Sequence, residues 1–222
     1  MVGIFHSMKP KERGTELCEA VLKGDAEKVE ALLREGADVN AMGGKNIHSV
    51  AGLTPLWRAV SLAGKEISSD WREFREALTQ FAPETPNWNH EAKRARLVGL
   101  VKMLIANGAN LEIHCRGRTP LAIAVCGSDL ELVVLLLANH ADPNAKTYSI
   151  FSKAAIHQKR KTTPGYYNSV LHEAVEKNLP QIVRTLVSSG ADTSLKDHEG
   201  KLPSDIASEK GFAEVLQALS KA

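Results

Sequence analysis

One short phrase occurs four times along the chain, and this repetition constrains the fold more than any other feature of the sequence. Each copy follows an apolar run with helical spacing, such as Leu97, Leu100, Val101, Leu104 and Ile105. Because Gly-Ala-Asp supplies a helix stop and a turn, the phrase marks the end of a recurring structural unit. The copies are Gly-Ala-Asp-Val-Asn at 36–40, Gly-Ala-Asn-Leu-Glu at 108–112, His-Ala-Asp-Pro-Asn at 140–144 and Gly-Ala-Asp-Thr-Ser at 190–194.

A second phrase opens the units at Thr15, Thr54, Thr119 and Ser169, and it takes the degenerate form Leu-Pro-Ser-Asp at 202–205. Thr or Ser before Pro is typical of a helix N-cap, because the first helical position after the cap accepts proline. The distance from this opening to the alanine of the closing phrase is 22 residues in three units, which begin at Thr15, Thr119 and Ser169. The sequence therefore predicts one helical unit used about five times.

These phrases resemble the ankyrin repeat, most fully at 117–145, and the resemblance covers nearly everything from about Gly14 to Ala222. It implies an all-α repeat solenoid, a helix-turn-helix stack of about five repeats joined by β-hairpins. After a leader at 1–13, a single ankyrin-repeat domain at 14–222 is expected. Its repeats are placed at about 14–41, 52–112, 117–145, 169–197 and 200–222.

The second repeat is interrupted at about 65–96, where 33 extra residues separate its two helices. The segment lacks both phrases of the repeat, which favours a true insertion over a decayed extra repeat. Trp71, Phe74, Leu78 and Phe81 have the spacing of an amphipathic helix. This predicted helix either packs on the solenoid or presents an aromatic docking surface.

The junction between the third and fourth repeats is 18 residues longer than the uninterrupted one, which predicts an extended hairpin at about 146–168. It holds five Lys or Arg residues and no Asp or Glu, whereas the whole chain carries a net charge of only +2. A solvated loop, an acidic protein partner and nucleic acid remain open interpretations. Candidate contact residues are Tyr148, Phe151, His157, Lys159, Arg160, Lys161, Tyr166 and Tyr167. A third interruption, at 42–48, adds seven residues to the first junction.

Composition limits which partners and which cellular compartment are expected for the chain. A net charge of +2 and a pI near 8.4 give no overall field that would favour nucleic acid or an anionic membrane. Cys18, Cys115 and Cys126 lack the spacing of a disulfide framework, which favours a reduced, cytoplasmic compartment. The sequence shows neither a signal peptide nor an apolar run of membrane-spanning length.

Chemistry-bearing motifs are absent from the sequence. No metal-ligand spacing, nucleophile elbow or phosphate-binding loop occurs, so neither a cofactor nor a metal is expected. His172 occupies the histidine position of the ankyrin opening, where hydrogen bonds between adjacent turns are the expected role. An enzyme would need a site in the 65–96 insertion, built from His90 with Glu84 or Glu91.

The resemblance implies a non-enzymatic scaffold that binds one protein partner through the concave face of its first helices and hairpin tips. We expect a monomeric chain that binds an acidic surface and inhibits or neutralises its partner, as an immunity protein does. A host-directed microbial effector or an adaptor is the alternative; nucleic-acid binding and enzymatic activity rank below these. The face maps to Leu53, Trp57, Ser61, Arg116, Arg118, Cys126, Asn168, Glu176, Lys177 and Lys201.

Overall fold

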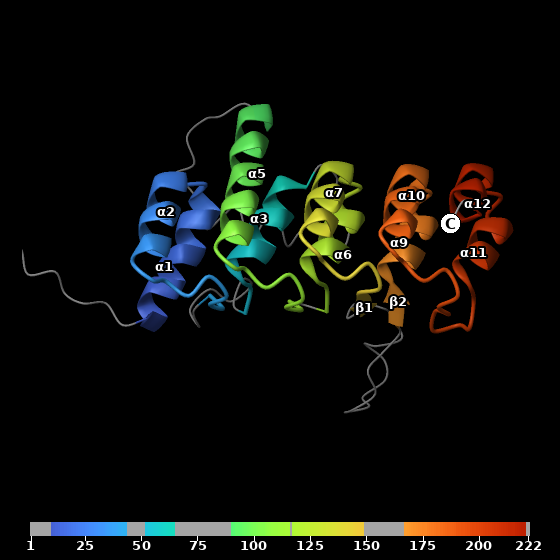
Figure 1. The fold of residues 1–222 in the computed structure, drawn as a ribbon, viewed down its shortest axis with the longest axis horizontal. Helices are drawn as coiled ribbons and strands as arrows, with labels where there is room; N and C mark the ends of the chain where they lie inside the picture. The colour runs from blue at the N-terminus through green and yellow to red at the C-terminus, as the bar shows by residue number, and fades with distance from the viewer. Residues whose placement is uncertain (1–9, 44–51, 65–89, 116, 149–166, 221–222) are drawn as a thin grey trace, which may run out of the picture. The chain divides into compact units, whose positions relative to one another are not determined.

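The computed structural model describes residues 10–43, 52–64, 90–115, 117–148 and 167–220, and helices dominate these ranges (Figure 1). Their contacts divide the chain into two compact units. Unit 1 comprises Met1–Ala63 and Phe74–Asn110, and unit 2 comprises Gly64–Glu73 and Leu111–Ala222. This largely helical content fits an all-α repeat solenoid.

Unit 1 contains two helix pairs: α1 (Pro10–Lys23) with α2 (Ala26–Arg34), and α3 (Pro55–Ala63) with α5 (His90–Ala106). The pairs stack, because α1 contacts α3 and α2 contacts α5. Leu17, Trp57, Leu100 and Leu104 are fully buried between them. Such stacking buries apolar faces that one helix pair alone leaves exposed to water.

Two boundaries in unit 1 differ from the sequence expectation. Helix α1 begins at Pro10, inside the predicted leader, and α5 begins at His90, inside the predicted insertion. Lys, Glu, Arg and Ala dominate residues 11–13 and 91–96, and these residues favour the helical conformation. Both helices therefore extend towards their N-termini. The predicted helix with Trp71 lies outside the described residues.

Unit 2 contains three helix pairs. They are α6 (Pro120–Cys126) with α7 (Leu130–Ala138), α9 (Val170–Glu176) with α10 (Pro180–Ser188), and α11 (Pro203–Glu209) with α12 (Ala213–Leu219). The first helices contact one another in the order α6, α9, α11, and the second helices in the order α7, α10, α12. Leu121, Leu132, Leu136, Leu171 and Leu186 are buried between these rows.

The closing phrases end the second helices as predicted. Gly36, Gly108 and Gly190 have positive φ angles, and His140 adopts the same conformation at φ 68°. The alanine that follows donates its N–H to a carbonyl of the preceding helix in every case, as from Ala191 to Leu186 at 3.0 Å. A left-handed residue at this place satisfies carbonyls that the helix end leaves open.

The opening phrases cap the first helices at three of their four predicted places. The hydroxyl oxygens of Thr54, Thr119 and Ser169 accept hydrogen bonds from backbone N–H groups three residues later. Thr15 instead lies within α1, so its predicted capping role is wrong. Leu202 offers no cap, and Asp205 accepts a bond from the Leu202 N–H at 2.9 Å.

The fifth position of the closing phrase links neighbouring repeats. The Asn40 Oδ1 atom accepts a bond from the Asn110 N–H in unit 1, at 2.8 Å. In unit 2 the Asn144 Oδ1 atom accepts from the Asp192 N–H at 2.8 Å. A Glu112 carboxylate oxygen makes the equivalent bond to the Asp142 N–H at 3.0 Å, so the link tolerates Asn or Glu.

A two-stranded antiparallel sheet joins α7 to α9. Strand β1 (Lys146–Tyr148) pairs with β2 (Tyr167–Ser169), with Lys146 opposite Ser169 and Tyr148 opposite Tyr167. Residues 149–166 of the predicted hairpin lie outside the described residues. The pairing is the base that an extended hairpin requires, and the length of that hairpin stays a prediction.

Candidate partner-binding surface

The predicted contact residues fall into three groups. Seven lie outside the described residues: Arg116, Phe151, His157, Lys159, Arg160, Lys161 and Tyr166. Tyr148 and Tyr167 are placed by their backbones alone, as cross-strand neighbours in β1 and β2. The remaining residues have described side chains. Leu53, Trp57 and Cys126 are buried, Ser61 is half-buried on α3 of unit 1, and the others lie in unit 2.

Trp57 is fully buried, as is Leu53, and Cys126 is 6% exposed. Trp57 is the fourth residue of its opening phrase, and His172 holds the same position in α9 and is also fully buried. This position therefore faces the space between stacked helices. Burial leaves Trp57 no surface for direct contact with a partner. This residue therefore belongs to the core of unit 1 rather than to a binding surface.

Arg118 is engaged within the chain. Its Nη1 atom donates to both carboxylate oxygens of Glu173, at 2.5 and 2.6 Å, and both side chains are largely buried. Arg118 pairs with Cys115 in an isolated antiparallel β-bridge just before α6, and Glu173 lies on α9. The ion pair therefore joins two adjacent repeats. Its guanidinium is thus neutralised by a carboxylate that lies 55 residues away in the sequence.

Asn168, Glu176 and His198 form a polar chain across adjacent repeats. The Asn168 Nδ2 atom donates to Glu176 at 3.3 Å, and its Oδ1 atom lies 3.1 Å from the His198 Nδ1 atom. Glu176 keeps exposed surface, but burial of its carboxylate raises the pKa, and the positive charge of Lys210 opposes that shift. The chain links β2 to the turn before α11.

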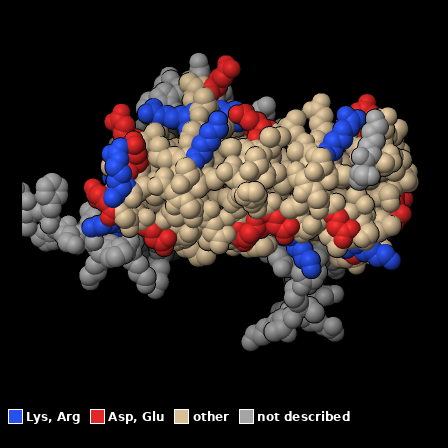
Figure 2. Space-filling view, in the orientation of Figure 1, with Lys and Arg blue, Asp and Glu red and all other residues tan. Residues whose placement is uncertain are grey.

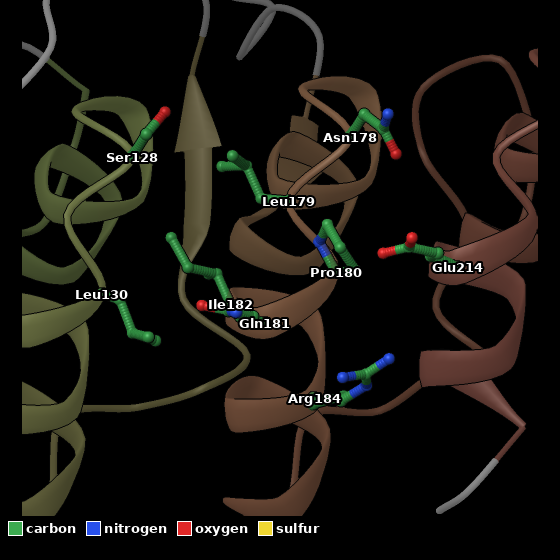
Figure 3. Close-up of a pocket in the computed structure, with 9 residues that line it drawn as sticks. All are labelled: Ser128, Leu130, Asn178, Leu179, Pro180, Gln181, Ile182, Arg184 and Glu214. Atoms are coloured by element: carbon green, nitrogen blue, oxygen red, sulfur yellow. The ribbon is translucent and has the colours of Figure 1, made fainter.

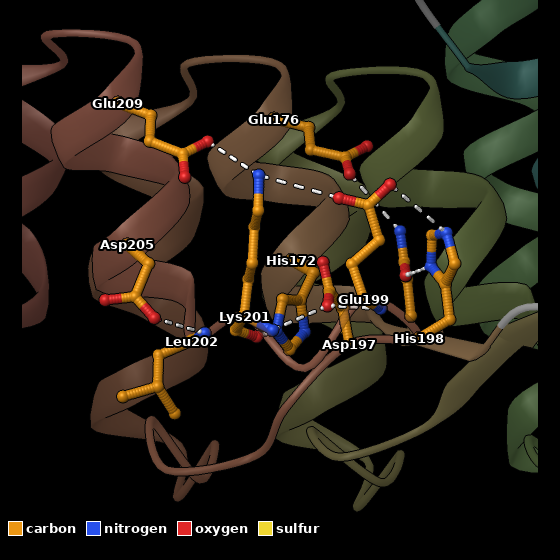
Figure 4. A network of polar contacts seen from close by, with 10 residues as sticks. His172, Glu176, Asp197, His198, Glu199, Lys201, Leu202, Asp205 and Glu209 are labelled. Carbon is orange, nitrogen blue, oxygen red and sulfur yellow. Dashed lines mark hydrogen bonds and ion pairs between the residues drawn. The ribbon is translucent and has the colours of Figure 1, made fainter.

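Lys201 follows that turn and faces two carboxylates (Figure 4). Its Nζ atom lies 2.7 Å from Glu209 and 3.5 Å from Glu199. The hydrogen bond to Glu209 raises the pKa of Lys201. Lys201 is therefore compensated within the chain, whereas Lys177, which is half-buried, has no ion pair with another described residue.

His172 has the structural role that the sequence predicted. Its Nδ1 atom lies 2.8 Å from the Ser169 hydroxyl and its Nε2 atom lies 3.2 Å from the Lys201 carbonyl oxygen. A carbonyl only accepts, so Nε2 carries the proton and Nδ1 accepts from Ser169. Burial lowers the pKa of His172, which keeps the ring neutral.

The face of unit 2 defined by the first helices and their connecting turns carries all of these groups, and we call it the first-helix face. Its described residues Arg118, Glu173, Asn168, Glu176 and His198 come from three successive repeats. Figure 2 shows Asp and Glu side chains along the edge of unit 2 from which the β1–β2 hairpin projects, with Lys or Arg side chains directly beside the hairpin.

The described residues contain no group of three or more His, Cys, Asp or Glu side chains arranged to hold a metal ion. The helices in the same part of the chain are all too short or too polar to span a membrane. Cys18, Cys115 and Cys126 are reduced and buried.

Comparisons with known proteins agree with the geometry. The family model for the ankyrin repeat matches residues 116–148 and 166–198. The chain is 33% identical over 119 residues to the B-cell lymphoma 3 protein homolog of Mus musculus, covering 53% of the chain and 23% of that protein. It is 30% identical over 187 residues to Rabankyrin-5 of Homo sapiens, covering 80% of the chain and 14% of that protein.

A third relative is protein phosphatase 1 regulatory subunit 27 of Mus musculus, 36% identical over 96 residues, or 42% of the chain and 50% of that protein. The chain thus spans half or less of these relatives. The repeat matches and these similarities show that the chain is an ankyrin repeat protein. Such repeats indicate a protein–protein interaction module.

Proposed function

We propose that the chain binds one protein partner with an acidic surface, and that binding inhibits or neutralises this partner. The observation that carries the proposal is the charge of the segment between β1 and β2. The stretch from Ala145 to Ser169 holds five cations and no acid in a chain whose net charge is +2. Concentrated charge of one sign steers association with a surface of the opposite sign.

The hairpin base supports this role. Pairing of Lys146 with Ser169 makes the intervening segment leave and rejoin the repeats at one place, directly before α9. A segment anchored in this way next to the first-helix face can contact the same partner as that face. Tyr148, Phe151, Tyr166 and Tyr167 provide apolar anchors, and aromatic residues are enriched where interfaces are energetically strongest.

The described contacts revise which residues of the first-helix face take part. Arg118 and Lys201 are held in ion pairs within the chain. We therefore propose that Lys159, Arg160 and Lys161 provide the electrostatic attraction for an acidic partner. A partner that reaches the face meets the exposed side chain of Glu176 and the half-buried Asn168 and Lys177. The contact set we propose is Tyr148, Phe151, His157, Lys159, Arg160, Lys161, Tyr166, Tyr167, Arg116, Asn168, Glu176 and Lys177.

Inhibition follows from the mode of action. A module of ankyrin repeats acts on its partner by occupying a surface, and an occupied active or assembly surface is inactive. A host-directed effector or an adaptor uses the same surface with another outcome. These alternatives differ in whether the bound partner stays active. Measuring the partner's activity in the complex distinguishes them.

Affinity capture tests the proposal. The wild-type chain is compared with a variant carrying Lys159→Glu, Arg160→Glu and Lys161→Glu in nuclease-treated extracts of the native source. The matched control reverses Lys23, Lys28 and Lys102, three exposed cations of unit 1 without a described ion pair. We expect a stoichiometric protein that is retained by the wild type and control and lost from the triple variant. Recovery of nuclease-sensitive material alone would replace the protein partner by nucleic acid.

A further inference from the structure

A hollow of about 230 Å³ opens in unit 2 where α7, α10 and α12 begin (Figure 3). Each first helix and second helix run antiparallel, so these N-terminal ends lie opposite the connecting turns that hold Arg118 and His198. The hollow is therefore separate from the first-helix face. Its lining comes from Ser128 and Leu130, from residues 178–182, and from Arg184 and Glu214.

One side of the hollow is apolar. Leu130 on α7 faces Leu179 and Ile182 at the start of α10, and Figure 3 shows these side chains on the α7 side of Pro180. One turn further along α7, Val134 is 47% exposed. This wall can bury one apolar side chain of a ligand, and 230 Å³ is too little for a whole helix.

The other side of the hollow carries two opposite charges. Arg184 on α10 and Glu214 on α12 lie on the α12 side of Pro180 (Figure 3). Both are exposed, and neither makes an ion pair or a side-chain hydrogen bond with another described residue. Both charges are therefore available to a ligand.

We propose that this hollow is a second docking site, which takes an extended segment of a partner protein carrying an apolar side chain next to one basic and one acidic residue. The apolar side chain occupies the wall formed by Leu130, Leu179 and Ile182. The acidic residue pairs with Arg184 and the basic residue with Glu214. This site goes beyond the surface proposed above, because a chain with two separate docking sites can hold two segments at once.

Capped pentapeptides provide the test. The first probe has the order glycine, leucine, lysine, aspartate, glycine; two comparison peptides carry two lysines or two aspartates at the charged positions. Each is titrated into the ¹⁵N-labelled 222-residue chain while amide resonances are followed by NMR. We expect shifts at Leu179, Gln181 and Ile182. The mixed peptide should bind about twofold to fivefold more tightly than either comparison peptide, the range expected for one exposed ion pair.

Charge reversal then changes the preference in a way that unfolding cannot imitate. With Arg184→Glu the two-lysine peptide becomes the best ligand, and with Glu214→Arg the two-aspartate peptide does. Lys23→Glu, on unit 1, leaves the order unchanged. Leu130→Asp places an acid in the first turn of α7, where helices tolerate it, and abolishes binding of all three peptides. Unchanged preferences in both reversals, or shifts that map away from the hollow, would overturn the proposal.

Discussion

Arg118 and Glu173 form a largely buried ion pair between adjacent repeats, with both carboxylate oxygens within 2.6 Å of one guanidinium nitrogen. Replacing Arg118 by Met or Glu173 by Gln leaves the other group partly buried without its partner. Because some solvent still reaches both side chains, we expect each change to lower the free energy of unfolding by about 1–3 kcal/mol. In a double-mutant cycle measured by urea denaturation, the double variant should lose less than the sum of the two.

The matched control is the pair of Lys201 and Glu209, which is 36% and 57% exposed. Because water screens this exposed pair, the corresponding cycle there should give a clearly smaller coupling than the cycle for Arg118 and Glu173. Equal couplings at the two sites would show that burial does not strengthen the Arg118 pair.

Asn144 tests the links between repeats. Its side chain accepts from the Asp192 N–H at 2.8 Å and donates to the Gly190 carbonyl at 3.3 Å. Asn144→Ala removes both bonds, and we expect a loss of about 1 kcal/mol in the free energy of unfolding. Glu112→Gln preserves the equivalent acceptor for Asp142 and should change stability by less than half as much. A larger loss for Glu112→Gln than for Asn144→Ala would contradict this account.

His172 predicts a pH dependence with a defined sign. Its folded-state pKa is lowered from 6.5 by burial, so its contribution to stability is complete above pH 6.5 and is lost as pH falls towards the lowered value. His172→Asn does not titrate. The difference in unfolding free energy between wild type and this variant should therefore shrink between pH 7.5 and pH 5.5, by at most about 1.4 kcal/mol for each pH unit.

Glu176 has a raised pKa and acts in the opposite direction, but it is present in both chains and cancels from that difference. A difference that stays constant or grows on acidification would refute a neutral, buried imidazole.

Each closing phrase begins with a residue in the left-handed backbone conformation, and His140, at φ 68°, is the one that is not glycine. His140→Gly removes the steric cost of its Cβ atom, and we expect a gain of about 0.5–1 kcal/mol in thermal or urea unfolding. Gly190→Ala is the converse change, at φ 93° in the next repeat, and should cost a similar amount. Destabilisation by His140→Gly would mean that the imidazole makes a contribution larger than this strain.

Local signals predicted the helical repeat well. The caps at Thr54, Thr119 and Ser169, the stops at Gly36, Gly108 and Gly190, and the role of His172 depend on residues close in sequence. Propensity and capping act over a few residues, so one sequence carries them in full. Thr15 was the exception, because helix-forming residues before it extend α1 back to Pro10.

The candidate surface was harder to predict, because exposure and pairing depend on residues far apart in the chain. Trp57 looks like an interface aromatic in a sequence but is fully buried by stacking helices. Arg118 looks like a free cation until α9 brings Glu173 beside it, 55 residues later. The hollow at Leu130, Arg184 and Glu214 had no sequence signal, since three separate helices contribute to it.

The most direct measurement of the central claim is the dissociation constant of the captured partner for three proteins: the wild type, the variant reversed at Lys159, Arg160 and Lys161, and the control reversed at Lys23, Lys28 and Lys102. All three are measured at low and physiological salt. We predict that the first variant binds about tenfold or more weakly, mainly through slower association, and that the control binds like the wild type. Equal affinity of the first variant and the wild type would contradict a partner-binding role for the basic segment.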